Sequence, residues 1–127
     1  MKRRTAREKA LQALFQIDIS NVEPSDAIEH VLDGAPQNDY LNRLVNGVVE
    51  KKQEIDQLII QNLEKWTIDR LANVDRNLLR LAIYELQFCK DEVPENVVFD
   101  EAIEIAKAYG DDQSSRFINA VLSKVKQ

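Results

Sequence analysis

Hydrophobic residues recur every three to four positions along most of this 127-residue chain, the spacing of one face of a helix. The first such run has Leu11 and Phe15 at its edge, and its other members are Ala6, Ala10, Ala13, Leu14 and Ile17. Thr5 and Glu8 stand three residues apart before it, as in a capping box. The pattern predicts a first helix that begins at Thr5 and carries Arg7 on its polar side.

The same spacing returns in the rest of the chain, interrupted by Asn, Pro and Gly residues. Pro24 stands near the start of one predicted helix and Gly34 beyond its end. Gly110 is expected to end another helix in a left-handed conformation. The predicted helices cover about residues 24–33, 38–63 with a break allowed at 50–53, 67–71 with Thr67 as its cap, 74–89, 95–109 and 113–125.

No segment shows sustained two-residue alternation between turn signals, so no strand is predicted. The fold class that follows is all-α, with about seven helices. The length suits one domain, which we expect to cover residues 1–127, with residues 1–4 as a flexible basic arm. We find neither a long apolar segment nor a secretory signal, and therefore expect a cytoplasmic protein without a membrane partner.

Charge is unevenly distributed in this acidic chain, whose formal net charge is -5. Residues 1–9 hold five basic residues and one acidic residue, a net charge of +4, so the remainder carries -9. Screening over about 8 Å at physiological salt lets such a basic segment attract a polyanion that the acidic body repels. The net charge therefore does not exclude a nucleic-acid partner.

Side chains with catalytic or ligand-binding potential are few. The sequence lacks the usual phosphate-binding, nucleophile-elbow and zinc-protease motifs, and it has one cysteine, Cys89, and one histidine, His30. Cys89 lies in an apolar run and is expected to be a small core residue. Acidic residues such as Glu101 and Asp111 stand near helix starts, where the helix dipole favours them. We expect no enzyme activity, no metal and no cofactor.

The basic segment is the first candidate binding site. Lys2, Arg3, Arg4 and Arg7 lie near a predicted helix start, where the helix dipole disfavours positive charge. A solvated terminus explains the segment equally well, but the local conflict favours a function such as phosphate binding.

The turn before the last predicted helix is the second candidate. Tyr109 and Phe117 flank a polar segment that contains Gln113 and Arg116. Aromatic faces with amides and guanidinium groups are typical of sites for single-stranded RNA. The same residue types also suit an ordinary helix corner with both aromatic rings in the core, and the residue types alone favour that alternative.

Four segments together resemble the NusB family of bacterial transcription antitermination factors: RRTAREKALQALFQ, DRNLLRLAIYEL, VPENVVFDEAIEIAKAYG and SSRFINAVL. The resemblance covers nearly the whole chain. It implies an all-helical fold of two small packed bundles. It also implies that the protein pairs with the ribosomal protein NusE, binds boxA-type single-stranded RNA of nascent transcripts, and acts in the antitermination complex of RNA polymerase.

The resemblance also implies particular site residues. The implied RNA-binding residues are Lys2, Arg3, Arg4, Arg7, Tyr109, Gln113, Arg116 and Phe117. Many relatives carry an acidic residue where this chain has Gln113, which leaves a specific base contact there open. The implied NusE-binding residues are Phe15 and Asp75, and Arg76 is a weaker candidate. Phe15 stands at the edge of the apolar run, so an exposed position and a core position are both open.

Two other functions remain open on the sequence. One is an RNA-recognition domain of an RNA-modifying methyltransferase system, and the other is a helical adaptor that binds only protein. The sequence also leaves open a monomer or a homodimer, in which the apolar edge at Leu11 and Phe15 would be covered.

Overall fold

The computed structural model describes residues 1–126, and every regular element in that range is helical. The elements are α1 (Arg3–Ser20), α2 (Pro24–Leu32), α3 (Asp39–Gln61), the 3-10 turn η1 (Ile68–Arg70), α4 (Asn73–Phe88), α5 (Glu95–Tyr109) and α6 (Ser114–Lys126). The all-α prediction is confirmed, and six α-helices with one short turn agree with about seven predicted helices.

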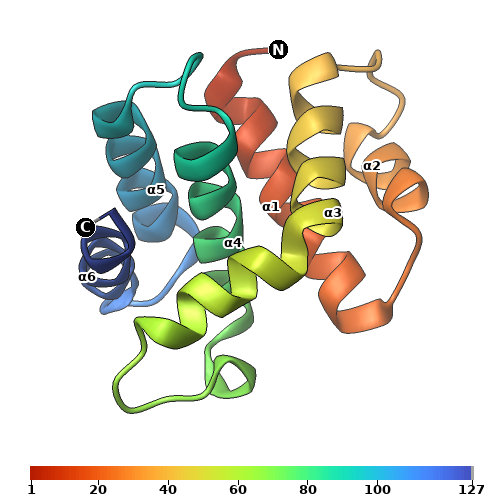
Figure 1. The fold of residues 1–127 in the computed structure, drawn as a ribbon. Helices are drawn as coiled ribbons and strands as arrows, with labels where there is room; N and C mark the ends of the chain where they lie inside the picture. Colours follow the sequence, from red (N-terminus) through yellow and green to blue (C-terminus); the bar gives the residue numbers. More distant parts are fainter. Residues whose placement is uncertain (127) are drawn as a thin grey trace.

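The helices form two packed groups, as the resemblance implied (Figure 1). Helices α1, α2 and α3 contact one another, and so do α4, α5 and α6. Helix α4 joins the groups, because it also packs against α1 and α3. Ten consecutive residues of α4, Asn77 to Leu86, are buried, so the helix is enclosed on all sides.

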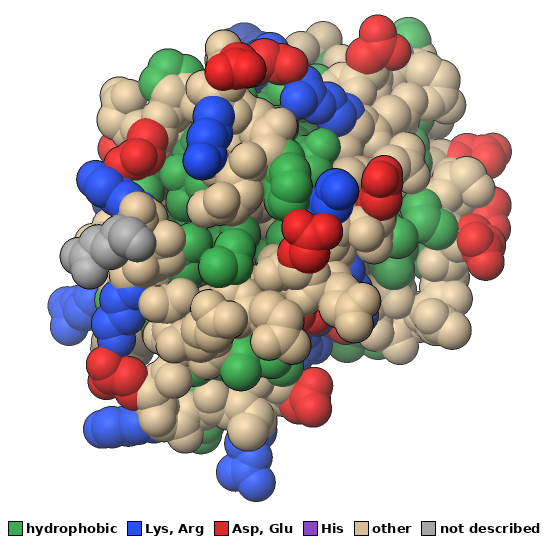
Figure 2. Space-filling view, in the orientation of Figure 1, with side chains coloured by type: hydrophobic (Ala, Val, Ile, Leu, Met, Phe, Trp, Pro, Cys, Tyr) green, Lys and Arg blue, Asp and Glu red, His purple; other side chains and the backbone are tan. Residues whose placement is uncertain are grey.

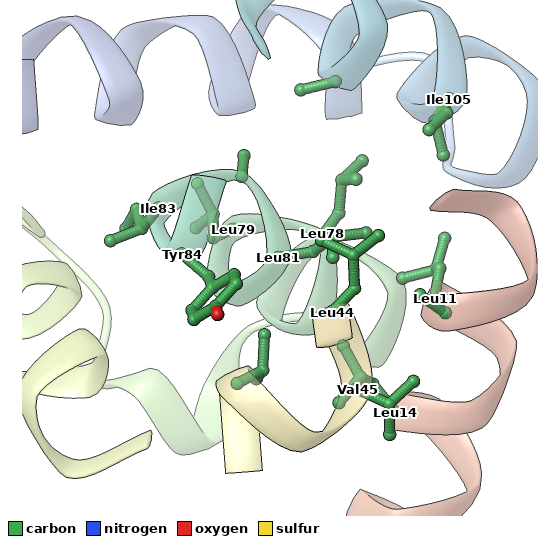
Figure 3. Close-up of a cluster of buried hydrophobic side chains, with 14 of the residues drawn as sticks. Leu11, Leu14, Leu44, Val45, Leu78, Leu79, Leu81, Ile83, Tyr84 and Ile105 are labelled. Atoms are coloured by element: carbon green, nitrogen blue, oxygen red, sulfur yellow. The ribbon is translucent and has the colours of Figure 1, made fainter. Parts of the chain in front are cut away.

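The core is continuous across both groups. Leu11 and Leu14 of α1, Leu44 of α3 and Ile105 of α5 point toward the leucines of α4 (Figure 3). Gly47 of α3 faces the ring of Tyr84, and a Cβ atom there would lie 2.2 Å from that ring. The glycine therefore lets α3 and α4 approach closely.

Several predicted helix ends are confirmed and others are wrong. Asn38 caps α3 by accepting a hydrogen bond from the Leu41 amide at 2.9 Å. Helix α3 continues through residues 50–53 but bends partway along its length (Figure 1). Thr67 precedes η1 without capping it through its side chain.

The first helix begins at Arg3, two residues before the predicted start. Lys2 occupies the N-cap position without a side-chain cap, and Thr5 lies inside the helix. The capping-box prediction is therefore wrong. Arg3 and Arg4 have tertiary contacts on other helices, described below, and these contacts favour the longer helix.

Gly110 ends α5 with extended backbone, φ -94° and ψ -169°, so the predicted left-handed conformation is wrong. A glycine is required there for a different reason. A Cβ atom at position 110 would lie 2.3 Å from the Ser114 hydroxyl oxygen, because the start of α6 packs directly against this residue.

Candidate functional site

The amino-terminal end of α1 holds three exposed basic side chains, Lys2, Arg3 and Arg4. The Arg3 guanidinium lies 4.3 Å from the centre of the Tyr40 ring on α3, a cation–π contact. Arg4 Nε donates to Glu101 Oε1 on α5 at 2.9 Å, and this arginine lowers the pKa of Glu101. Helices α3 and α5 therefore hold two of the predicted RNA-binding cations in place while leaving them exposed to solvent.

Arg7 is buried, so its predicted place on the polar side of α1 is wrong. Its side chain is 4% exposed and that of Glu85 on α4 is 2% exposed. Arg7 Nε and Nη2 each donate to a Glu85 carboxylate oxygen at 2.9 Å, and the Tyr40 hydroxyl donates to the same carboxylate. Burial lowers the pKa of Arg7, but Glu85 more than offsets this and raises it. Arg7 cannot contact RNA in this arrangement, since its guanidinium faces the protein interior.

The turn between α5 and α6 is fixed by its own hydrogen bonds. The Asp111 amide donates to Ser114 Oγ at 2.9 Å, and the Gln113 amide donates to Asp111 Oδ1 at 2.8 Å. Ser114 is buried, whereas Gln113 and Arg116 are exposed and Phe117 is half-buried. The turn therefore presents three of the predicted RNA-binding side chains on a rigid helix start.

Tyr109 lies in a different place from the one predicted. It is 40% exposed and lines a groove of about 1270 Å³ together with Phe15, which is 39% exposed. Leu11 and Val74 add to the apolar lining, and α2 contributes acidic side chains and His30. Phe15 is thus exposed, as the partner prediction requires. Tyr109 shares this groove, while Phe117 lines a separate one, so the two aromatic residues do not form one stacking platform.

Asp75 lies in the first turn of α4, and among residues 1–126 its carboxylate lacks hydrogen-bond partners for one oxygen. Its Oδ1 atom is buried and has no hydrogen-bond partner among the described residues. Burial raises the pKa of Asp75, the Ser114 hydroxyl opposes this, and the charge of Asp111 adds to the rise. The neighbouring Val74 lines the groove of Phe15 and Tyr109. Asp75 therefore lies between that groove and the start of α6.

Arg76, the weaker partner prediction, has internal contacts instead. Arg76 Nη2 donates to Asp18 Oδ2 on α1 at 2.7 Å, and Nη1 donates to the backbone carbonyls of Ile68 and Leu71. Its side chain is mostly buried. These contacts join α1, η1 and α4, so its predicted role as a partner-binding residue does not fit its position.

A second groove, of about 190 Å³, separates α6 from the segment that follows α3. Phe117 and Lys124 line it from α6, and Lys65 and Trp66 line it from the facing segment. Trp66 is 56% exposed. The sequence pattern did not point to Trp66 as a candidate, because a single tryptophan after an apolar run gives no periodic signal for burial or exposure.

Metal-binding clusters and membrane-spanning helices are absent from the part of the chain that the structure describes. Residues 1–126 contain no cluster of three or more His, Cys, Asp or Glu side chains that could hold a metal ion. None of the helices in that range is both long enough and apolar enough to cross a membrane. Cys89 is buried as predicted, and burial raises the pKa of its thiol.

Comparison with known proteins gives consistent matches over nearly the whole chain. The family model described as "NusB family" matches residues 4–127. The transcription antitermination protein NusB of Bacillus licheniformis is 56% identical over 126 residues, which cover 99% of this chain and 97% of that protein. The protein of the same name from Bacillus subtilis is 52% identical, over 99% of this chain and 95% of its own length.

Two solved structures are also similar. T. maritima NusB superimposes with a TM-score of 0.90 and 39% identity, covering 99% of this chain and 91% of that one. A crystal structure of the antitermination factors NusB and NusE in complex with double-stranded RNA gives a TM-score of 0.88 and 32% identity, covering 98% and 95%.

Proposed function

Because this chain belongs to the NusB family, we propose that it acts as a transcription antitermination factor that binds boxA-type RNA together with NusE in the antitermination complex of RNA polymerase. Its curated relatives are antitermination proteins that align over nearly their whole length, which favours this function over a methyltransferase-associated domain. The similar NusB–NusE–RNA complex supports both partners. In this role the protein binds and positions, and no chemical step is assigned to it.

The proposed RNA surface has two parts. At the start of α1, Lys2, Arg3 and Arg4 supply exposed positive charge for phosphates, which requires no particular base sequence. At the start of α6, Gln113, Arg116 and Phe117 supply an amide, a guanidinium and an aromatic face for bases. Arg7 supports the first part indirectly, because its ion pair with Glu85 anchors α1 beneath the exposed cations.

The proposed NusE surface is the groove lined by Phe15 and Tyr109, together with Asp75 at its edge. Two exposed aromatic rings with apolar neighbours are typical of the centre of a protein interface. Phe15 also has its own geometric support, since a ring this exposed contributes little to the core.

The observation that carries the RNA proposal is the set of exposed cations at the start of α1. We expect boxA-type RNA to bind more tightly than a scrambled strand, with higher affinity when NusE is present. If Lys2, Arg3, Arg4 and Arg116 each meet a phosphate, log K should fall with log salt with a slope of roughly -3. Labelled RNA in an anisotropy titration at several salt concentrations measures this slope.

The variant K2A/R3A/R4A should reduce the slope to about -1, since about one phosphate contact would remain. The matched control K51A/K52A removes two cations from α3 and should leave the slope unchanged. A slope near zero in the unmodified protein would refute the role of the basic segment. A duplex of the same sequence, added as a competitor, tests whether single-stranded RNA is the preferred form.

Replacement of Phe15 by alanine should weaken NusE binding by about 30-fold or more, the effect typical of an aromatic hot spot of about 2 kcal/mol. Calorimetric titration of NusE into each variant measures the loss. Val49→Ala, an exposed apolar position on α3, is the control and should bind as the unmodified protein does. Equal affinity in Phe15→Ala would place the NusE surface elsewhere.

A further inference from the structure

Trp66 is the single tryptophan of the chain, and the fold does not use it as a core residue. Its side chain is 56% exposed, although tryptophan is among the side chains that gain most from burial. The loop that carries it joins α3 to η1 at the bottom of Figure 1. Tryptophan is enriched at interfaces, where a partner can cover its large apolar face.

The groove beside Trp66 suits a flat, partly apolar group. Leu63 and Val121 contribute apolar surface, and Phe117 lies in the same groove. Ala120 on α6 is small and exposed, so the groove stays open between the two aromatic residues. Nucleic-acid bases stack on such aromatic faces without a requirement for a particular sequence.

The charge around this groove suits an anionic backbone. Lys65 lines the groove, and Arg116 lies outside it, next to Phe117 in the sequence; both are exposed, and neither makes an ion pair with another described residue. Lys124 Nζ lies 2.5 Å from Glu64 Oε1, so it is the one cation of the groove that an acidic side chain neutralises. Figure 2 shows Lys and Arg side chains, with an acidic side chain among them, along the left and lower-left edge of the molecule, the side on which Figure 1 places α6.

One stripe of partly exposed residues, running from the turn before α6 along that helix, connects this groove with the proposed RNA surface. Its members recur at helical spacing and are Gln113, Arg116, Phe117, Ala120 and Lys124. A strand that contacts Gln113 and Arg116 and follows this stripe therefore reaches Trp66 directly after Phe117.

We propose that the RNA surface continues along α6 to Trp66. Trp66 stacks on the base next to the one that Phe117 contacts, and Lys65 binds a phosphate of the RNA backbone. The inference rests on the proposed RNA-binding function and adds a contact to it. The occupant is single-stranded RNA rather than a peptide, because Lys65 lines the groove without an ion pair to another described residue, and because Phe117 joins the groove to the surface of Gln113 and Arg116.

The single tryptophan makes a direct test available. Stacking of a base on Trp66 should quench its emission, and the same titration with end-labelled RNA gives affinity independently. The experiment uses the full chain with NusE and boxA-type RNA, and the complex with Trp66→Ala provides the fluorescence blank. We expect quenching that saturates together with the binding curve.

The substitutions give the second readout. Trp66→Ala should weaken RNA binding by about tenfold, within the range seen for loss of one stacked base, and Trp66→Phe should retain most of the affinity. Ile60→Ala, another exposed apolar position on α3, is the matched control and should have no effect. Circular dichroism confirms that each variant is folded, and the quenching itself is measured on the unmodified protein.

Three outcomes would overturn the inference. RNA that binds without quenching, and equally well to Trp66→Ala, would leave the proposed function intact and remove Trp66 from it. A change in emission caused by NusE alone, with no further change on adding RNA, would make the groove a protein-docking site. No binding of labelled RNA to the unmodified complex would refute the proposed function together with the inference.

Discussion

Replacing Arg7 by alanine is expected to lower the free energy of unfolding by about 3–5 kcal/mol, the largest effect anticipated for a polar substitution in this protein. The substitution leaves the Glu85 carboxylate, which is 2% exposed, without its guanidinium partner. Among residues 1–126, only the Tyr40 hydroxyl would still donate to it. An unpaired buried carboxylate costs far more than the ion pair itself contributes, because its hydration has been lost. Denaturant unfolding followed by circular dichroism measures the change.

Three comparisons make this prediction specific. Arg4→Ala removes an exposed arginine from the same helix and should change stability little, as for other surface ion pairs. The double variant R7L/E85L replaces both charges by apolar groups and should recover much of the loss. Arg7→Ala, measured well below its unfolding temperature, should keep the salt dependence of RNA binding. A loss of less than about 1 kcal/mol in Arg7→Ala would contradict the buried position of this ion pair.

Asp18→Ala is expected to cost about 2–3 kcal/mol, the second largest effect. Asp18 Oδ2 accepts hydrogen bonds from Arg76 at 2.7 Å and from Asn77 at 2.9 Å, and Asn73 also donates to it. Arg80 lies 3.5 Å away but keeps a separate ion pair with Asp56 of α3. The alanine variant would leave several donors on α4 unpaired. Asp112→Ala, an exposed aspartate on the α5–α6 turn, serves as the control.

The contribution of Asp18 should also depend on pH. Burial raises the pKa of this carboxyl, but the hydrogen bonds and charges of Arg76, Asn77 and Arg80 outweigh it, so the pKa falls below its ordinary value of 3.8. A depressed folded-state pKa gives stability that is fully present above the unfolded value and is lost as pH falls through the folded value. The stability difference between the unmodified protein and Asp18→Asn should therefore be constant from pH 7 to about 5 and shrink below about 3.8. A difference that stays constant down to pH 3 would contradict the role of the charge.

Both substitutions affect α4, the helix that joins the two groups. Arg7 and Asp18 lie at opposite ends of α1, and each pairs with a charged residue of α4. Charged contacts at both ends fix how α1 lies along α4, since a shift of one turn would leave both sets unpaired. The exposed cations near Arg7 and the groove near Asp75 depend on that alignment.

Local patterns in the sequence were sufficient to predict most of the helices and the family. The apolar spacing is local, and it predicted α2, α4 and α6 to within about two residues of their observed bounds. The exposure of single residues was harder to predict from this spacing, because a residue at the edge of an apolar run can face either a neighbouring helix or solvent. Phe15 turned out to be exposed, as its predicted role required.

Which charged and aromatic side chains are available for binding depends on how the helices pack together. The sequence predicted Arg7 and Arg76 to be surface residues. In the structure, Arg7 forms an ion pair with Glu85 and Arg76 forms one with Asp18, and both partners are distant in the sequence. The packing of helices likewise separates Tyr109 from Phe117 and brings Phe117 to the groove of Trp66. The physical reason is that helical periodicity records whether a side chain is apolar, whereas ion pairs and exposure depend on which distant residues the packed helices bring into contact.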